Sequence, residues 1–136
     1  MNSMWKQIAG GSVLLVVSTV LHVACIASSI ALLKTMGADY SPDGMIAALA
    51  SFAAILLGHT IQVWLWALVI QRIGALERLE DAIYFMLVTT TTLGYGDIHL
   101  AKQYRLFAAL AAVSGLLCFG LSTAFFVAVF AKTIGV

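Results

Sequence analysis

The chain has 136 residues, of which 62% are apolar and 10% are charged, and its formal net charge is +1. Soluble domains have about a quarter of their residues charged and about half apolar, so this composition predicts a membrane protein. The small net charge and the lack of a basic run argue against nucleic acid as a partner and leave the lipid bilayer as the main one.

Three stretches of the sequence contain no Asp, Glu, Lys or Arg: residues 7–33, 44–71 and 106–131. A helix of about 20 apolar residues crosses a bilayer, so each stretch is long enough to span it. The sequence therefore predicts an all-α membrane protein with three transmembrane helices. A more polar segment, residues 72–105, separates the second helix from the third.

The first predicted helix covers residues 5–33. A cleaved signal peptide is the alternative for an N-terminal apolar stretch, but this apolar run is too long for one. The helix lacks the Arg or Lys at every third residue that a voltage sensor needs in order to respond to the membrane field. Cys25 lies in this helix and Cys118 in the third. They form no CxxC pair and are interpreted as small buried apolar side chains.

The second predicted helix covers residues 42–73. Ser41 is a typical N-cap and Pro42 suits the first turn. Trp64 and Trp66, near the far end, are expected to lie at the membrane interface. His59 is in the middle of the span, where an ionisable side chain indicates either a functional site or a hydrogen bond to a neighbouring helix. The hydrogen bond is the simpler interpretation.

Residues 79–91 form a helix-compatible segment that is too short to span the bilayer. Two carboxylates, Glu80 and Asp81, fall in its first turn, where they favour the helix dipole. A short helix followed by polar backbone predicts a re-entrant loop, which is tolerated at membrane depth only against protein or a water-filled path. The third spanning helix follows over residues 102–132. Its glycines, Gly115 and Gly120, allow either close helix packing or a bend.

The polar run after the short helix reads TTTTLGYGDI, residues 89–98. Left-handed φ angles at intervals would turn successive carbonyls the same way, and Gly94 and Gly96 adopt such angles at low cost. Four chains around one axis would then stack rings of oxygens that replace the hydration shell of a potassium ion. The residues expected to provide these oxygens are Thr92, Leu93, Gly94 and Tyr95.

The sequence T-x-G-Y-G-D, within residues 91–97, resembles the selectivity filter of the potassium channel pore-domain family. The resemblance implies an outer helix at residues 45–73, a pore helix at 79–91, a filter at 92–96 and an inner helix at 102–132. Residues 45–136 would then form the pore domain, and residues 1–44 would add one N-terminal transmembrane helix and a linker. It also implies a homotetramer that binds K⁺ at Thr92, Leu93, Gly94 and Tyr95, with Gly96 completing the filter, and that needs no other cofactor.

The resemblance extends to residues that support the filter and line the inner helix. Gly115 matches a hinge glycine, and Phe119-Gly120 matches a pair that follows it in simple bacterial members. Phe119, Thr123 and Val127 are spaced by four, so they share a face that is expected to border the conduction path. The filter would be supported by Thr91, Tyr84, Val88 and Asp97. Val88 stands where some members have a glutamate that pairs with this aspartate, so Asp97 is expected to bind the Tyr84 hydroxyl instead.

In this family the filter faces the outside and the C-terminus is cytoplasmic, which implies a multi-pass protein of the cell (inner) membrane. The positive-inside rule disagrees. It would count four basic residues outside, Arg72, Arg78, Lys102 and Arg105, against Lys34 and Lys132 inside. The resemblance of the filter is the more specific of the two indications.

The function predicted from the residues and the resemblance together is passive, potassium-selective conduction. Two alternatives remain: a nonselective cation channel of the same architecture, and a non-conducting subunit of a larger channel assembly. An enzyme is not expected, because no paired carboxylates, metal-spaced His/Cys set or nucleophile–base pair occurs. The sequence names neither a gating stimulus nor an accessory gating subunit. His99 follows the filter and is either an external pH sensor or an exposed residue without a role.

Overall fold

The structure is a computed structural model, which describes residues 2–37 and 41–134. Within these residues the chain is built from helices: α1 (Asn2–Met36), α2 (Pro42–Arg72), α3 (Leu79–Thr90), a single 3₁₀ turn η1 (Lys102–Tyr104) and α4 (Arg105–Ile134). The predicted ranges 1–44 and 45–136 also include residues 1, 38–40 and 135–136, which lie outside the described residues.

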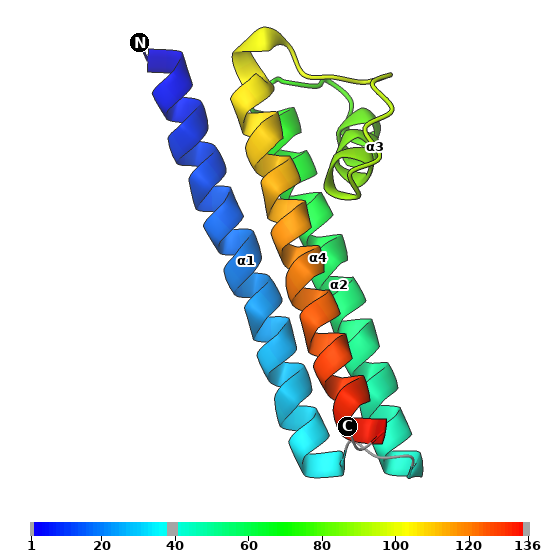
Figure 1. The fold of residues 1–136 in the computed structure, drawn as a ribbon. Coiled ribbons are helices and arrows are strands. Elements are labelled where there is room, and N and C mark those ends of the chain that lie inside the picture. The colour runs from blue at the N-terminus through cyan, green and yellow to red at the C-terminus, as the bar shows by residue number, and fades with distance from the viewer. Residues whose placement is uncertain (1, 38–40, 135–136) are drawn as a thin grey trace.

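Three of the helices are long and apolar enough to cross a membrane, over residues 4–36, 42–72 and 102–131. They lie side by side and alternate in direction, so the start of α1, the end of α2 and the start of α4 meet at one end of the bundle (Figure 1). The short helix α3 lies at this same end. The prediction of an all-α protein with three spanning helices and one short helix is therefore confirmed.

The start of α2 follows from local chemistry. The Ser41 hydroxyl accepts a hydrogen bond from the backbone N–H of Gly44 at 3.1 Å, and Pro42 occupies the first turn beside Asp43. This bond satisfies one of the backbone donors that a helix start leaves open. The expected N-cap is confirmed. The turn after α2 contains Gly74 with a φ of 71°, a left-handed angle that suits glycine.

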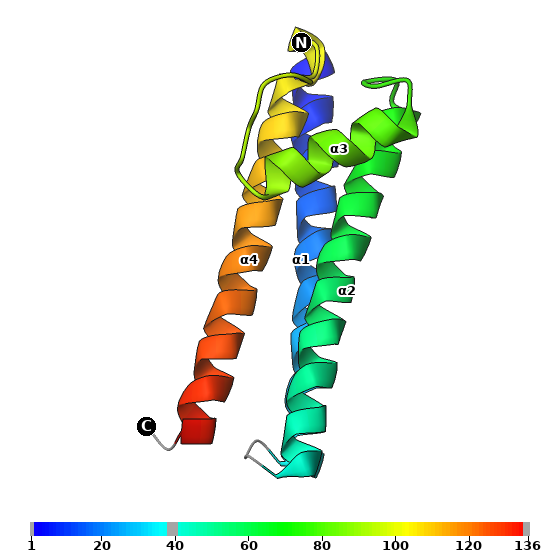
Figure 2. The ribbon, with the colours of Figure 1, turned by 90° about the vertical axis from the view of Figure 1, so that its right-hand side faces the viewer.

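The helix α1 packs along both α2 and α4, whereas α2 and α4 contact each other little. Viewed from the side of α3, α1 lies behind the space between α2 and α4, and α3 crosses the same space in front (Figure 2). The helix that precedes the predicted pore domain is therefore an integral part of the bundle.

Hydrogen bonds between buried side chains join these helices. The Trp66 indole N–H of α2 donates to the Ser18 hydroxyl of α1 at 3.0 Å, and the Gln62 amide of α2 donates to the Ser114 hydroxyl of α4 at 2.9 Å. Such bonds, together with close packing, hold transmembrane helices together. The prediction that Trp66 lies at the membrane interface is wrong, because its side chain is fully buried. Trp64, two residues away, is 45% exposed.

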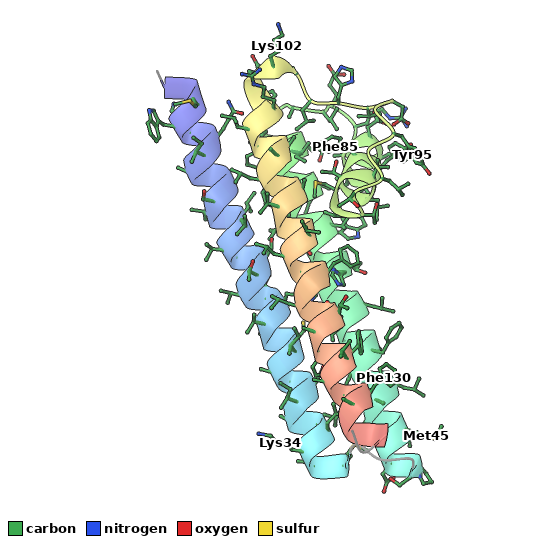
Figure 3. All side chains as sticks on the ribbon, viewed as in Figure 1. Lys34, Met45, Phe85, Tyr95, Lys102 and Phe130 are labelled. Atoms are coloured by element: carbon green, nitrogen blue, oxygen red, sulfur yellow. The ribbon has the colours of Figure 1, made fainter. Side chains whose placement is uncertain are left out.

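The apolar core is thickest at the end of the bundle where α3 lies. Trp66 and Ile70 of α2 pack there with Met86 of α3 and Phe107 of α4. Phe85 belongs to the same core, on the side of α3 that faces the bundle, whereas Tyr95 lies on the side away from it (Figure 3). This core fixes α3, and with it the glycine-rich segment that follows.

Candidate functional site

The short helix α3 begins at Leu79 and ends at Thr90, one residue before the predicted end. Its 12 residues rise by about 18 Å, whereas the hydrocarbon core of a bilayer is about 30 Å thick. Glu80 and Asp81 lie in its first turn, as expected. The helix therefore ends part of the way along the bundle, and residues 91–97 follow it.

The backbone of residues 91–97 alternates between right-handed and left-handed φ angles. Thr92, Gly94 and Gly96 have φ angles of 62°, 58° and 77°, so every second residue is left-handed. The left-handed angles expected at both glycines are confirmed. The one at Thr92 was not predicted, because a threonine seldom adopts it.

The end of α3 binds this segment through backbone hydrogen bonds. The carbonyl of Val88 accepts from the N–H of Leu93 at 3.1 Å and from the N–H of Gly94 at 3.3 Å, and the carbonyl of Thr89 accepts from Thr92 at 3.2 Å. In the described part of the chain, no backbone N–H bonds to the carbonyls of residues 92–95. The segment thus directs its donors to α3 and leaves four successive carbonyls open to an external partner.

The segment is also fixed at its far end, where the Tyr84 hydroxyl donates to a carboxylate oxygen of Asp97 at 2.6 Å. This bond is the one expected when Val88 replaces a carboxylate. The hydrogen bond from Tyr84 lowers the pKa of Asp97 below its ordinary value of 3.8, and the same bond raises the pKa of the Tyr84 hydroxyl. Asp97 is therefore a carboxylate at neutral pH.

The substitution Tyr84→Phe removes the donor and keeps the ring. We expect the pKa of Asp97 to rise, because the hydrogen bond that favours the carboxylate is lost. The bond contributes stability above the ordinary carboxyl pKa, and this contribution disappears as pH falls through the lowered pKa of the folded state. Carbon NMR of the Asp97 carboxyl against pH measures the shift. An unchanged titration would contradict the assignment of Tyr84 as the partner that lowers this pKa.

The inner end of the short helix packs directly against α4. A Cβ atom at Gly115 would lie 2.7 Å from the Cα atom and 2.8 Å from the carbonyl oxygen of Thr90. The helix α4 is continuous through this position. Of the two interpretations of this glycine, close packing is thus the one visible in the structure. Around Gly120, in contrast, a Cβ atom would meet nothing within 4 Å.

The residues expected to share one face of α4 are all exposed in the single chain: Phe119, Thr123 and Val127. The Phe119 ring also stacks on His59 of α2, with 4.3 Å between ring centroids. The hydroxyl of Thr123 bonds to the carbonyl of Phe119 at 2.9 Å within α4. The face is therefore open along its length and touches α2 at one point.

The described residues contain no group of three or more His, Cys, Asp or Glu that could hold a metal ion. The donors that the geometry does offer are backbone oxygens of residues 92–95. Carbonyl oxygens are hard donors that suit alkali cations.

A protein-family model described as an ion channel matches residues 55–132. The chain belongs to this ion-channel family. The match runs from α2 through α3 and residues 91–97 into α4, so the channel part of the chain contains the site described above, and α1 lies outside it. Neither a search of curated proteins nor a search of solved structures returned a match.

The sequence did not reveal one group of side chains between the helices of the bundle. His59 does bond to a neighbouring helix, as the simpler interpretation held, and its Nε2 atom lies 3.0 Å from the Ser122 hydroxyl oxygen of α4. The same hydroxyl bonds to His22 of α1, which the sequence had not marked as a site residue. The available signal was the presence of two histidines in stretches without any charged residue.

Proposed function

We propose that four copies of this chain form a potassium-selective channel that conducts K⁺ passively, with residues 45–136 as its pore domain. The observation that supports this most is the backbone of residues 92–95, with alternating hand and four carbonyls free of backbone partners. Oxygen rings built from these carbonyls would replace the hydration shell of the ion. Thr92, Leu93, Gly94 and Tyr95 would bind K⁺, and Gly96 would complete the filter.

Four-fold assembly is required by this chemistry, because one chain supplies a quarter of each ring. The exposure of large side chains beside the filter supports it. Leu93 is 57% exposed and Tyr95 is 66% exposed in the single chain, although both are large enough to pack in an interior. Neighbouring copies in a homotetramer would cover them.

The supporting residues have defined tasks in this proposal. Thr91 and Val88 end the pore helix, and the pair of Tyr84 and Asp97 holds the outer end of the filter. The inner helix would border the path with Phe119, Thr123 and Val127, whose exposure agrees with that position. Gly115 would set how closely this helix approaches the pore helix, and Gly120 would be a position at which it can bend.

The orientation in the cell (inner) membrane is proposed from the family pattern, with the filter outside and the C-terminus in the cytoplasm. The structure places the described end of α4 opposite the end that carries α3 (Figure 1). Lys102 lies at the α3 end and Lys34 at the opposite end (Figure 3). The excess of basic residues at the α3 end therefore remains in conflict with the positive-inside rule.

The test is cation flux into liposomes that contain the purified protein. We expect K⁺ flux that barium blocks, with Na⁺ flux lower by at least about tenfold, a difference of about 1.4 kcal/mol in barrier height. Gly94→Asp should abolish the flux, because a side chain at this left-handed position disfavours the backbone conformation and its carboxylate adds a charge beside the ion. Gly10→Ala is the matched control, since a Cβ atom at this position of α1 lies 4.0 Å from its nearest neighbour.

The other outcomes separate the alternatives. Equal Na⁺ and K⁺ flux would make the protein a nonselective cation channel. The absence of any flux from a tetramer of confirmed size would support a non-conducting subunit of a larger assembly. Both results would overturn potassium-selective conduction by this protein alone.

A further inference from the structure

Three polar side chains from three different helices meet in the middle of the bundle. The Nε2 atom of His22 in α1 lies 2.6 Å from the Ser122 hydroxyl oxygen in α4, and the Nε2 atom of His59 in α2 lies 3.0 Å from the same oxygen. The two imidazole rings are 4.5 Å apart between centroids. We call these three residues the histidine–serine cluster. It joins α1, α2 and α4 at a single oxygen atom.

The hydrogen bonds of Ser122 determine which ring nitrogens carry protons. Its hydroxyl donates to the carbonyl of Cys118 at 2.8 Å, so its single proton is already used. The oxygen must then accept from both histidines, because a hydroxyl has one donor and two acceptor positions. Both neutral rings are therefore protonated at Nε2 and carry a lone pair at Nδ1.

The lone pair of His22 has no partner. The side chain of His22 is 1% exposed, and its Nδ1 atom is a buried polar atom without a hydrogen bond in the described part of the chain. A Cβ atom at Gly58 would lie 3.2 Å from this Nδ1 and 3.3 Å from the sulfur of Cys25, so the lone pair faces α2 beside this thiol. Leaving a buried acceptor unpaired costs free energy, so this nitrogen is a position at which a proton can bind.

The surroundings limit how many protons the cluster can hold. The groups that face it are Cys25 of α1, Gln62 of α2 and Cys118 of α4, and none of them is an Asp, Glu, Lys or Arg. No Asp, Glu, Lys or Arg occurs in residues 7–33, 44–71 or 106–131. Without a counter-charge, two adjacent imidazolium rings repel each other strongly in this medium. The two histidines are thus expected to titrate as one unit.

A proton can reach the cluster from the side of α4 that the proposed pore uses. His59 is only half-buried, and its ring stacks on Phe119, which is 41% exposed on the face expected to border the conduction path. A proton on His59 can be shared with the Gln62 side chain, whereas a proton on the Nδ1 atom of His22 gives a donor without a partner among the described residues. In that second case the packing of α4 against α1 and α2 must change or admit water. The position of α4 is thereby linked to the charge of the two rings.

We propose that His22, His59 and Ser122 form an intramembrane binding site for one proton, through which α1 makes the pore responsive to pH. The second half of this statement rests on the proposed channel function. The first half depends only on the geometry of the cluster.

The binding site itself is tested by ¹⁵N NMR of histidine-labelled full-length protein in lipid bilayers. His99, which lies in the exposed loop after the filter, is the internal reference for a separate histidine. We expect both His22 and His59 to show the neutral Nε2–H tautomer at high pH, and the pair to take up one proton between them on acidification. A full proton on each ring, or an Nδ1–H tautomer on either, would overturn the proposal.

The regulatory half is tested by K⁺ flux from about pH 8 to about pH 4, on both sides of the ordinary histidine pKa of about 6.5. Wild-type flux should change by at least about fivefold, the low end of ordinary coupling between sites. The double variant His22→Gln/His59→Gln keeps amide donors for Ser122 and should lose this change, whereas His99→Gln should keep it. A response that persists in the double variant would disprove regulation through the cluster.

The two failures can be told apart. If the wild-type protein shows no flux at any pH while the NMR experiment finds one shared proton, the channel function fails and the proton site stands. If K⁺ flux is normal and the rings titrate independently, the channel function stands and the proton site fails. Variants that do not form the wild-type oligomer by size-exclusion chromatography are replaced by the corresponding asparagine variants.

Discussion

Gly115→Val is expected to lower the free energy of unfolding by at least about 3 kcal/mol, the upper end of the usual cost of overpacking. The reason is that a Cβ atom at this position would lie 2.7 Å from the Cα atom of Thr90, and backbone atoms cannot move aside as a flexible side chain would. Displacing Thr90 moves the end of α3, so K⁺ flux should fall as well. Titration with a denaturing detergent measures the stability, and the liposome assay measures the flux.

Gly120→Ala is the matched control for this experiment. Gly120 lies in the same helix as Gly115, and a Cβ atom added there meets nothing within 4 Å. Alanine is favoured over glycine in a helix by about 0.5–1 kcal/mol, so the stability of this variant should be unchanged or slightly higher. Equal stability of the two variants would show that Gly115 serves as a flexible point rather than as a close contact.

Trp66→Ala should be as damaging, with a loss of about 3–5 kcal/mol in the free energy of unfolding. The Trp66 side chain is fully buried, packs edge-on to Phe107 at 5.0 Å between centroids, and donates to Ser18 of α1. Its removal leaves a cavity where α1, α2 and α4 meet and takes away a bond to α1. Detergent unfolding and the oligomer size measure the effect.

Trp64→Ala provides the comparison, since this tryptophan lies two residues away on the same helix and is 45% exposed. Its loss should cost less than about 1 kcal/mol, because no internal cavity forms. Equal effects of the two substitutions would mean that Trp66 is not packed inside the bundle, and would contradict the packing of α1 in this structure.

The sequence was sufficient for features that depend on local pattern. Stretches without charged residues gave the three spans, and the length of residues 79–91 gave a helix that ends before it can cross the membrane. The glycine spacing gave two left-handed positions at Gly94 and Gly96. The pairing of Tyr84 with Asp97 followed from the family resemblance, because Val88 stands where some members have a glutamate that pairs with this aspartate.

Features that depend on tertiary packing could not be predicted in this way. The positions of Trp64 and Trp66 near one end of α2 do not show which of the two side chains faces another helix. Trp66 is buried because α1 packs on its side of α2. The left-handed φ angle of Thr92 opposes the preference of its own side chain. It accompanies the hydrogen bonds that the backbone N–H groups of residues 92–94 donate to carbonyls at the end of α3. The histidine–serine cluster requires three helices in register, which no single helix pattern specifies.

The packing of α1 determines whether the rest of the chain can be separated from it. The family match covers α3, nearly all of α4 and much of α2, yet α2 and α4 contact each other little and are joined mainly through α1 and α3. Ser18 and His22, both on α1, form hydrogen bonds with Trp66 of α2 and Ser122 of α4. The two-helix unit of this protein is therefore not a transferable module. A chimaera that moves residues 42–134 onto another scaffold must bring α1 with it, or rebuild the α1-facing surfaces of α2 and α4.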